Sequence, residues 1–115
     1  MLVLHFHPES VFDRVTFDPV TVDPPYDLVG IFLSSETQTD ASARYVLSEL
    51  RALGGDPSKH WGGGGNALTI HANGQTTTLI TQWEEPERTC ELPTEWLIDA
   101  LERYALFCDG RDRQA

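Results

Sequence analysis

The stretch Leu68–Trp83, LTIHANGQTTTLITQW, decides the fold of this 115-residue chain. Asn73-Gly74 is the strongest two-residue hairpin signal, because a type I′ turn needs positive φ at both central positions. That turn predicts a register in which Ala72 lies opposite Gln75. Side chains alternate between the two faces of a sheet, so one face of the hairpin should be buried. The expected buried face carries Leu68, Ile70, Leu79 and Trp83.

Further strands are expected before this hairpin. Met1–Phe6 has the composition of a first strand, and 14–17 of a short second one. The continuous apolar run Leu28–Leu33 has strand length and predicts a central strand of the sheet. Three prolines interrupt the segment 18–27, which is therefore expected to be a loop or a sheet edge.

Two helices complete the expected structure. The first begins near Asp40, a favourable N-cap, and stops at Gly54-Gly55. The second begins around Pro93, because proline is favoured in the first helical turn. Its apolar stripe is Leu97, Ile98, Leu101, Tyr104, Ala105 and Cys108. The last residues, 109–115, lack an apolar anchor and are expected to fray.

These elements predict an α+β fold, with an antiparallel or mixed sheet of four to six strands and two helices packed on one face. The chain is long enough for one domain only, expected over residues 1–108 with 109–115 as the tail. Cys90 and Cys108 fit two buried thiols in a reducing compartment, with a single disulfide as the alternative.

Acidic residues dominate the charge. Eighteen acids against eight bases give a formal net charge of −10. A polyanion repels nucleic acids and anionic membranes and attracts basic protein surfaces. The absence of an apolar run of about 20 residues or of a signal-peptide pattern favours a cytoplasmic protein. The acids gather towards the two ends of the sequence, which predicts an acidic face.

Residues with catalytic or ligand chemistry are sparse. His5 and His7 share one face of a predicted strand, as in many metal sites, and His60 or His71 would have to complete the ligand set. Gly62–Gly65 leads into a strand rather than a helix, so it is interpreted as a flexible entry to the hairpin and not as a phosphate loop. The sequence carries no nucleophile motif, and neither a metal nor a cofactor is assigned.

Two acidic groups are the candidate binding surfaces. The segment 9–27 is broken by prolines, so its carboxylates are expected to be exposed and close together. It is the favoured group of the two, because Arg14 is its only base. A second dense group follows the hairpin, and Trp61 is an additional candidate because tryptophan is enriched at interface centres. The predicted partner-binding residues are Asp13, Asp18, Asp23, Asp27, Glu84, Glu85, Glu87 and Trp61.

The segment 60–107 resembles small bacterial immunity proteins, which neutralise contact-dependent and other polymorphic toxins. A YacL-like family shares the same order of motifs. The resemblance rests on Trp61, Gly65-Asn66, Asn73-Gly74, Glu91-Leu92-Pro93 and a helix ending at Phe107. It implies a non-enzymatic acidic inhibitor that binds a cognate toxin domain, a basic protein such as a nuclease. The alternatives are a regulatory or adaptor domain that binds another basic protein, and a metal-dependent enzyme that uses His5 and His7.

Overall fold

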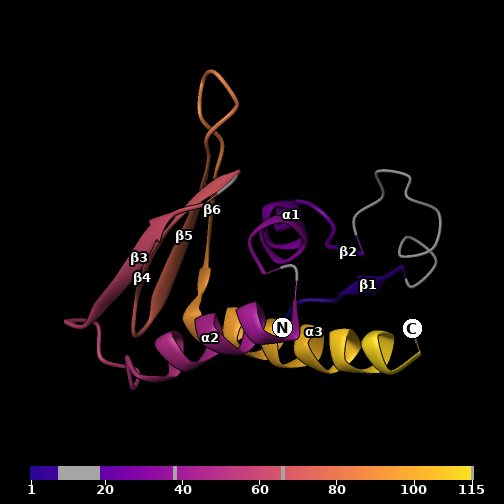
Figure 1. Cartoon of the computed structure of the whole chain (residues 1–115). Helices are drawn as coiled ribbons and strands as arrows, with labels where there is room; N and C mark the ends of the chain where they lie inside the picture. Colours follow the sequence, from indigo (N-terminus) through magenta and orange to yellow (C-terminus); the bar gives the residue numbers. More distant parts are fainter. Residues whose placement is uncertain (8–18, 38, 66, 115) are drawn as a thin grey trace.

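Two antiparallel sheets and three helices make up the part of the chain that the computed structural model describes, which is residues 1–7, 19–37, 39–65 and 67–114, without the side chains of 111–114. The protein is therefore α+β (Figure 1). Its elements in order are β1 (His5–Phe6), β2 (Val20–Thr21), α1 (Asp27–Glu36), α2 (Asp40–Arg51), β3 (His60–Gly64), β4 (Leu68–Asn73), β5 (Thr76–Thr81), β6 (Thr89–Pro93) and α3 (Thr94–Gln114).

The larger sheet is a four-stranded antiparallel meander in the order β3-β4-β5-β6. The hairpin predicted from Asn73-Gly74 is present as β4 and β5, but its predicted register is wrong by two residues. Ala72 lies opposite Thr77, not Gln75, and Ile70 lies opposite Leu79. A shift of two residues keeps every side chain on its predicted face. Leu68, Ile70 and Leu79 are accordingly buried.

The turn between β4 and β5 differs from a type I′ turn. The Asn73 side-chain oxygen accepts hydrogen bonds from the backbone N–H groups of Gln75 (2.7 Å) and Thr76 (2.8 Å). Gly74 does not adopt a positive φ. Instead, its N–H donates to the Asp56 carbonyl at 3.0 Å, and a Cβ at this position would overlap the backbone of Gly55 and Asp56. Glycine is required here for close approach, not for its left-handed conformation.

The run Leu28–Leu33 forms part of helix α1, so the predicted central strand is wrong. The helix has the large sheet on one side and β2 on the other, and its buried residues therefore point in several directions. A helix covered on several sides is apolar almost all round and loses its 3.6-residue pattern. Gly30 permits close packing, since a Cβ there would lie 2.9 Å from the Val22 nitrogen.

The helices α2 and α3 lie side by side across one end of the sheet (Figure 1). α2 begins at Asp40 as expected, but its N-cap is Thr39, whose hydroxyl accepts from the Ser42 N–H at 3.1 Å. It ends at Arg51, before the predicted stop at Gly54-Gly55. α3 begins at Thr94, because Pro93 is the last residue of β6. Its helical backbone continues to Gln114, over most of the segment 109–115 that the sequence predicts to fray. The predicted stripe of α3 is buried except for the half-buried Ile98.

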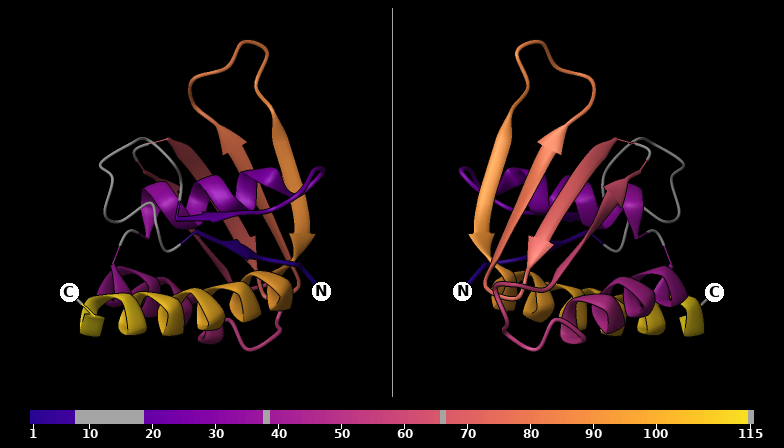
Figure 2. Two further views of the ribbon diagram at one scale, coloured as in Figure 1. Left: turned by 90° about the vertical axis from the view of Figure 1, so that its right-hand side faces the viewer. Right: turned by 90° about the vertical axis from the view of Figure 1, so that its left-hand side faces the viewer.

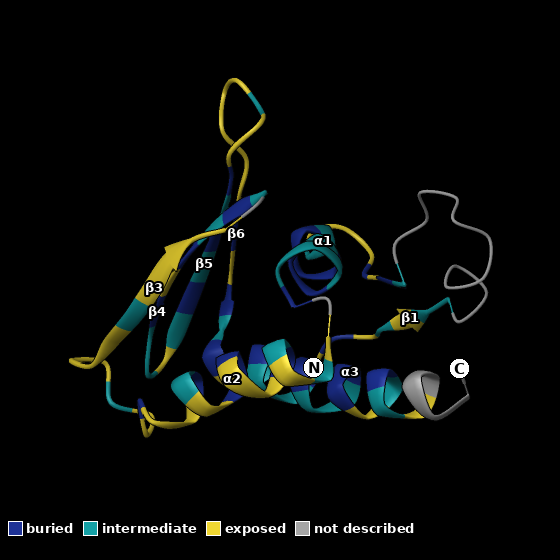
Figure 3. Ribbon diagram, viewed as in Figure 1, coloured by how far each residue is buried: buried dark blue, intermediate teal, exposed yellow. Residues whose placement is uncertain are grey.

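In the described part of the chain, α1 covers one face of the large sheet and no helix lies over the opposite face (Figure 2). Buried residues accordingly concentrate between the sheet, α1 and the α2–α3 pair (Figure 3). Trp83, predicted on the core face, is instead 52% exposed. β5 ends at Thr81, so strand alternation no longer determines where residue 83 points.

The small sheet pairs β1 with β2, with His5 opposite Thr21. Of the expected strand Met1–Phe6, only its last two residues pair, and the expected strand at 14–17 lies outside the described residues. The segment 18–27 was expected to be a loop or an edge, and its described part contains β2 and the first residue of α1. Phe6 stacks on Phe107 with ring centroids 4.7 Å apart, which fixes β1 against α3.

Candidate partner-binding surface

The connection between β5 and β6 projects beyond the sheet as a narrow loop (Figures 1 and 2). Its base is closed by Thr81 and Arg88. The Thr81 N–H donates to the Arg88 carbonyl at 3.0 Å, and the Arg88 N–H donates to the Thr81 hydroxyl at 2.9 Å. We call residues 82–88 the acidic loop, because they contain Glu84, Glu85 and Glu87.

Arg88 joins the acidic loop to helix α1. Its guanidinium donates to Asp27 at 2.7 Å and forms an ion pair with Glu84 at 3.5 Å. The hydrogen bond to Asp27 is the main reason that the pKa of Arg88 is raised, and the nearby negative charges of Asp27 and Glu84 add to the effect. The guanidinium therefore stays charged, and it holds the loop base against the first turn of α1.

Two glutamates and a tryptophan of the acidic loop are exposed to solvent. Glu85 and Glu87 are exposed, whereas Glu84 is half-buried beside Arg88. Trp83, which precedes Glu84 and Glu85 in the same loop, presents about half of its surface to water. Residues 82–88 contain three acids and one base, and that base, Arg88, pairs with Asp27 and Glu84, so the region retains a negative charge. An indole bordered by carboxylates suits a basic surface that contains an apolar pocket.

The other predicted acidic group is only partly visible. Asp13 and Asp18 lie outside the described residues. Asp23 is 80% exposed and lies 3.2 Å from the His5 ring nitrogen. Asp27 was expected to be exposed, and this expectation is wrong: its side chain is 26% exposed and bound to Arg88. The structure thus joins Asp27 to Glu84, a member of the other acidic group, through Arg88.

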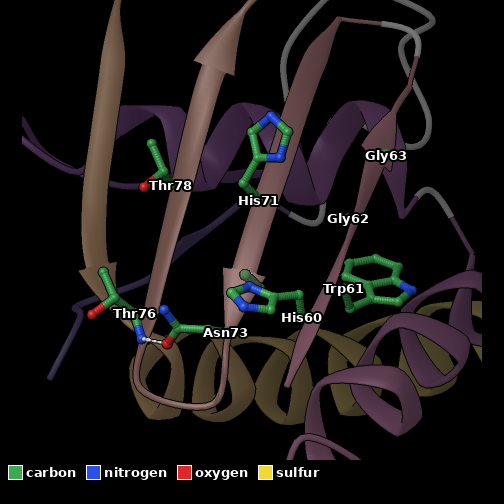
Figure 4. A pocket seen from close by; sticks show the side chains of 9 residues that line it. His60, Trp61, Gly62, Gly63, His71, Asn73, Thr76 and Thr78 are labelled. Carbon is green, nitrogen blue, oxygen red and sulfur yellow. Dashed lines mark hydrogen bonds between the residues drawn. The ribbon is translucent and has the colours of Figure 1, made fainter. Parts of the chain in front are cut away.

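Trp61 lies at the outer edge of β3, half-buried against the core (Figure 4). Gly62–Gly65 was interpreted as a flexible hairpin entry, but most of it is strand: Gly62, Gly63 and Gly64 belong to β3. Gly65 follows β3 and leaves room for the Glu36 carboxylate, whose Oε1 accepts from the Ala67 N–H at 2.6 Å. This contact ties the end of α1 to the turn between β3 and β4.

A shallow hollow of about 580 Å³ covers the open face of the sheet beside β3 (Figure 4). The side chains of His60, His71 and Thr78 stand on this face, away from α1. A second, more apolar hollow of about 440 Å³ lies between α1, α2 and β3. Its aromatic lining residues are Phe32, Tyr45 and Trp61. Neither lining includes a cysteine, and the only carboxylate is Glu36.

The two candidate metal-binding histidines have other neighbours. His5 faces Asp23, and the His7 ring nitrogen lies 2.9 Å from the Thr21 hydroxyl. Within the described part of the chain, no group of three or more His, Cys, Asp or Glu residues is arranged to hold a metal ion. His60 and His71 lie on the large sheet and His5 on the small one, so the expected ligand set comes from separate sheets.

Cys90 and Cys108 are buried thiols that form no disulfide, as expected for two buried thiols. Burial raises the pKa of the Cys90 thiol, and the negative charge of Asp27 raises it further. Since the thiolate is the nucleophilic form, Cys90 is protonated and poorly reactive at neutral pH.

Sequence reasoning found the glutamates of the acidic loop but missed the exposure of Trp83 and the role of Arg88. The signal for the first is local: QWEEPER, residues 82–88, is a polar, proline-containing segment in which a strand is hard to continue. The signal for the second is not local, because Asp27 and Arg88 are brought together by the packing of α1 on the sheet.

The described helices include none that is long and apolar enough to cross a membrane. The acidic loop is the candidate surface because it presents an exposed indole and two exposed carboxylates on a base that hydrogen bonds hold in place. No protein family, curated protein or solved structure matches this chain.

Proposed function

We propose that this protein is an immunity protein, which neutralises a cognate bacterial toxin domain by stoichiometric binding through the acidic loop. The observation that carries the proposal is the exposed Trp83 at a projecting loop with Glu85 and Glu87, on a chain of net charge −10. The resemblance of residues 60–107 to immunity proteins supplies the class of partner, and the loop supplies the surface.

In this proposal, electrostatic attraction sets the rate of association, and burial of apolar surface sets the lifetime of the complex. The net charge accelerates encounter with a basic partner, and the loop carboxylates orient it. Trp83 then provides the contact area that determines how long the complex lasts, because tryptophans in desolvated pockets contribute much of the binding free energy.

The chemistry of the partner follows from the same features. A toxin that cleaves nucleic acid has a basic substrate site, which a carboxylate-rich loop fits electrostatically. The loop would then cover that site or a basic surface beside it. Such a toxin acts inside the cell, so we place the complex in the cytoplasm.

Co-purification with the toxin domain encoded by a neighbouring reading frame tests this function. The two proteins should elute together with a mass of one copy each, and co-expression should protect cells from the toxin. Trp83→Ala should raise the dissociation constant at least about 30-fold, equivalent to about 2 kcal/mol.

The matched control is Tyr45→Ala, which removes another exposed aromatic side chain, 60% exposed, from helix α2. It should bind and protect like the parent. Absence of both complex and protection would reject the immunity function. Equal losses in the two variants would reject the acidic loop as the surface.

A further inference from the structure

Among the strands that the structure describes, β3 is an open edge of the large sheet, hydrogen-bonded to β4 on one side only. The Gly65 N–H donates to the Leu68 carbonyl at 2.9 Å, and this pair continues the β3–β4 register. Hydrogen-bonded pairs alternate along antiparallel strands. Trp61 and Gly63 therefore direct their backbone groups towards β4. His60, Gly62 and Gly64 direct theirs outward, away from the sheet.

This edge lacks the features that normally prevent strands from pairing with other chains. Proteins protect such edges with prolines, bulges or inward-pointing charges. β3 has no proline and pairs with β4 without a bulge over its whole length. Three of its five residues are exposed glycines, so its outward N–H and C=O groups are open to approach.

We propose that two copies of this protein associate by pairing β3 with β3 in antiparallel fashion, about a two-fold axis at Gly62. His60, Gly62 and Gly64 are evenly spaced, so this register sets His60 opposite Gly64 of the second copy and Gly62 opposite itself. Each of the three residues then donates one backbone N–H and accepts one at its carbonyl. The two four-stranded sheets become one continuous sheet.

Side chains in this register are complementary. Trp61 lies opposite Gly63 of the second copy, and a Cβ at Gly63 would have no atom within 4 Å. The half-exposed indole can therefore extend over the neighbouring glycine, an arrangement that stabilises glycine-containing strand pairs. His60 likewise faces a glycine. The sequence HWGGG pairs with itself without two bulky side chains meeting.

Charge favours association of two copies through β3 rather than through β6, the other edge strand of the large sheet. The residues 57–65 around β3 contain Lys59 and His60 and no acid, and the Glu36 carboxylate near Gly65 accepts hydrogen bonds from the Ala67 and Leu68 N–H groups. β6, at the other edge, contains the exposed Glu91 and follows the acidic loop. Two chains of net charge −10 repel each other least through an acid-poor surface. Added salt screens the remaining repulsion, so the dimer should strengthen with ionic strength.

The dimer does not depend on the proposed toxin binding. The acidic loop joins β5 to β6, and β4 separates these two strands from β3. Its first residue, Gln82, reaches the end of β3 at Gly64, whereas Trp83 and the three glutamates follow further along the loop and stay available in the dimer. The two associations also have opposite salt dependence, since steering towards a basic toxin weakens as salt rises. Failure of one proposal is therefore distinguishable from failure of the other.

Sedimentation velocity of the purified protein tests the inference. A short edge pairing gives a small interface, so dimer should accumulate between about 10 μM and 1 mM, and more strongly at high salt. Gly64→Pro removes an outward N–H from each copy and should raise the dimer dissociation constant at least about tenfold. Gly64→Ala is the control: it adds a Cβ 3.3 Å from the side-chain nitrogen of Gln82 but keeps the N–H, and should dimerise like the parent.

Amide hydrogen exchange in the parent protein gives a second readout that needs no variant. The outward N–H groups of His60, Gly62 and Gly64 should become protected as protein concentration rises, while those of Trp61 and Gly63 are protected throughout. A monomer at all concentrations, or a dimer in which these outward amides exchange as fast as in the monomer, would overturn the proposal. Equal dimerisation of a folded Gly64→Pro protein would do the same.

Discussion

At the scale of single residues, the turn at Gly74 is predicted at the correct position but for the wrong structural reason. The dipeptide Asn73-Gly74 predicts a turn, and a turn is present between β4 and β5. The predicted cause was positive φ. The observed cause is contact with the backbone of Gly55 and Asp56, which leaves no space for a Cβ. Local sequence reports the preference for a turn but not the segment that packs against it.

Substitution of Gly74 separates the two causes. A type I′ turn tolerates Asn, which adopts positive φ readily. Steric exclusion by Asp56 does not, so Gly74→Asn and Gly74→Ala should both lower the free energy of unfolding by about 1–3 kcal/mol. Gly63→Ala, with open space at its Cβ, should change it by less than about 1 kcal/mol. Denaturant melts measure these values, and a Gly74→Asn protein as stable as the parent would restore the φ explanation.

At the scale of elements, the sequence predicted best the segments that have one buried side. The stripe of α3 and the alternation of β4 and β5 are read correctly because each has a buried and an exposed face. Helix α1 is misread because it is covered on several sides. β3 is missed because Gly62–Gly64 carry no side chains whose pattern could reveal a strand.

Gly110 tests the length of α3. It is exposed, has no positive φ and has nothing within 4 Å of a Cβ. If α3 continues through it to Gln114, Gly110→Ala should stabilise the helix by about 0.5–1 kcal/mol. Thermal unfolding measures the gain, and Gly54→Ala, at φ 59°, should lose stability as the opposite control. No change in the Gly110→Ala melt would show that the segment frays, as its sequence alone suggests.

At the scale of the whole molecule, composition predicted the class of surface, and the fold determined where it lies. The charge of −10 is visible in the sequence. The joining of Asp27 and Glu84 by Arg88 is not, because it requires α1 to pack against the large sheet. The acidic loop follows β5 and precedes β6, and β4 separates these strands from β3, so the two proposed interfaces are built from different strands of the sheet.

The most direct test of the central claim, that the acidic loop binds a basic toxin domain, is the association rate of the purified pair between about 50 mM and 500 mM salt. The test compares Glu85→Gln/Glu87→Gln with Glu91→Gln/Glu95→Gln, two double variants that lose the same charge from exposed positions. The account predicts that the rate falls with salt, and that the loop variant has both a slower rate and a shallower salt dependence than its control. A rate independent of salt, or identical behaviour of the two double variants, would contradict it.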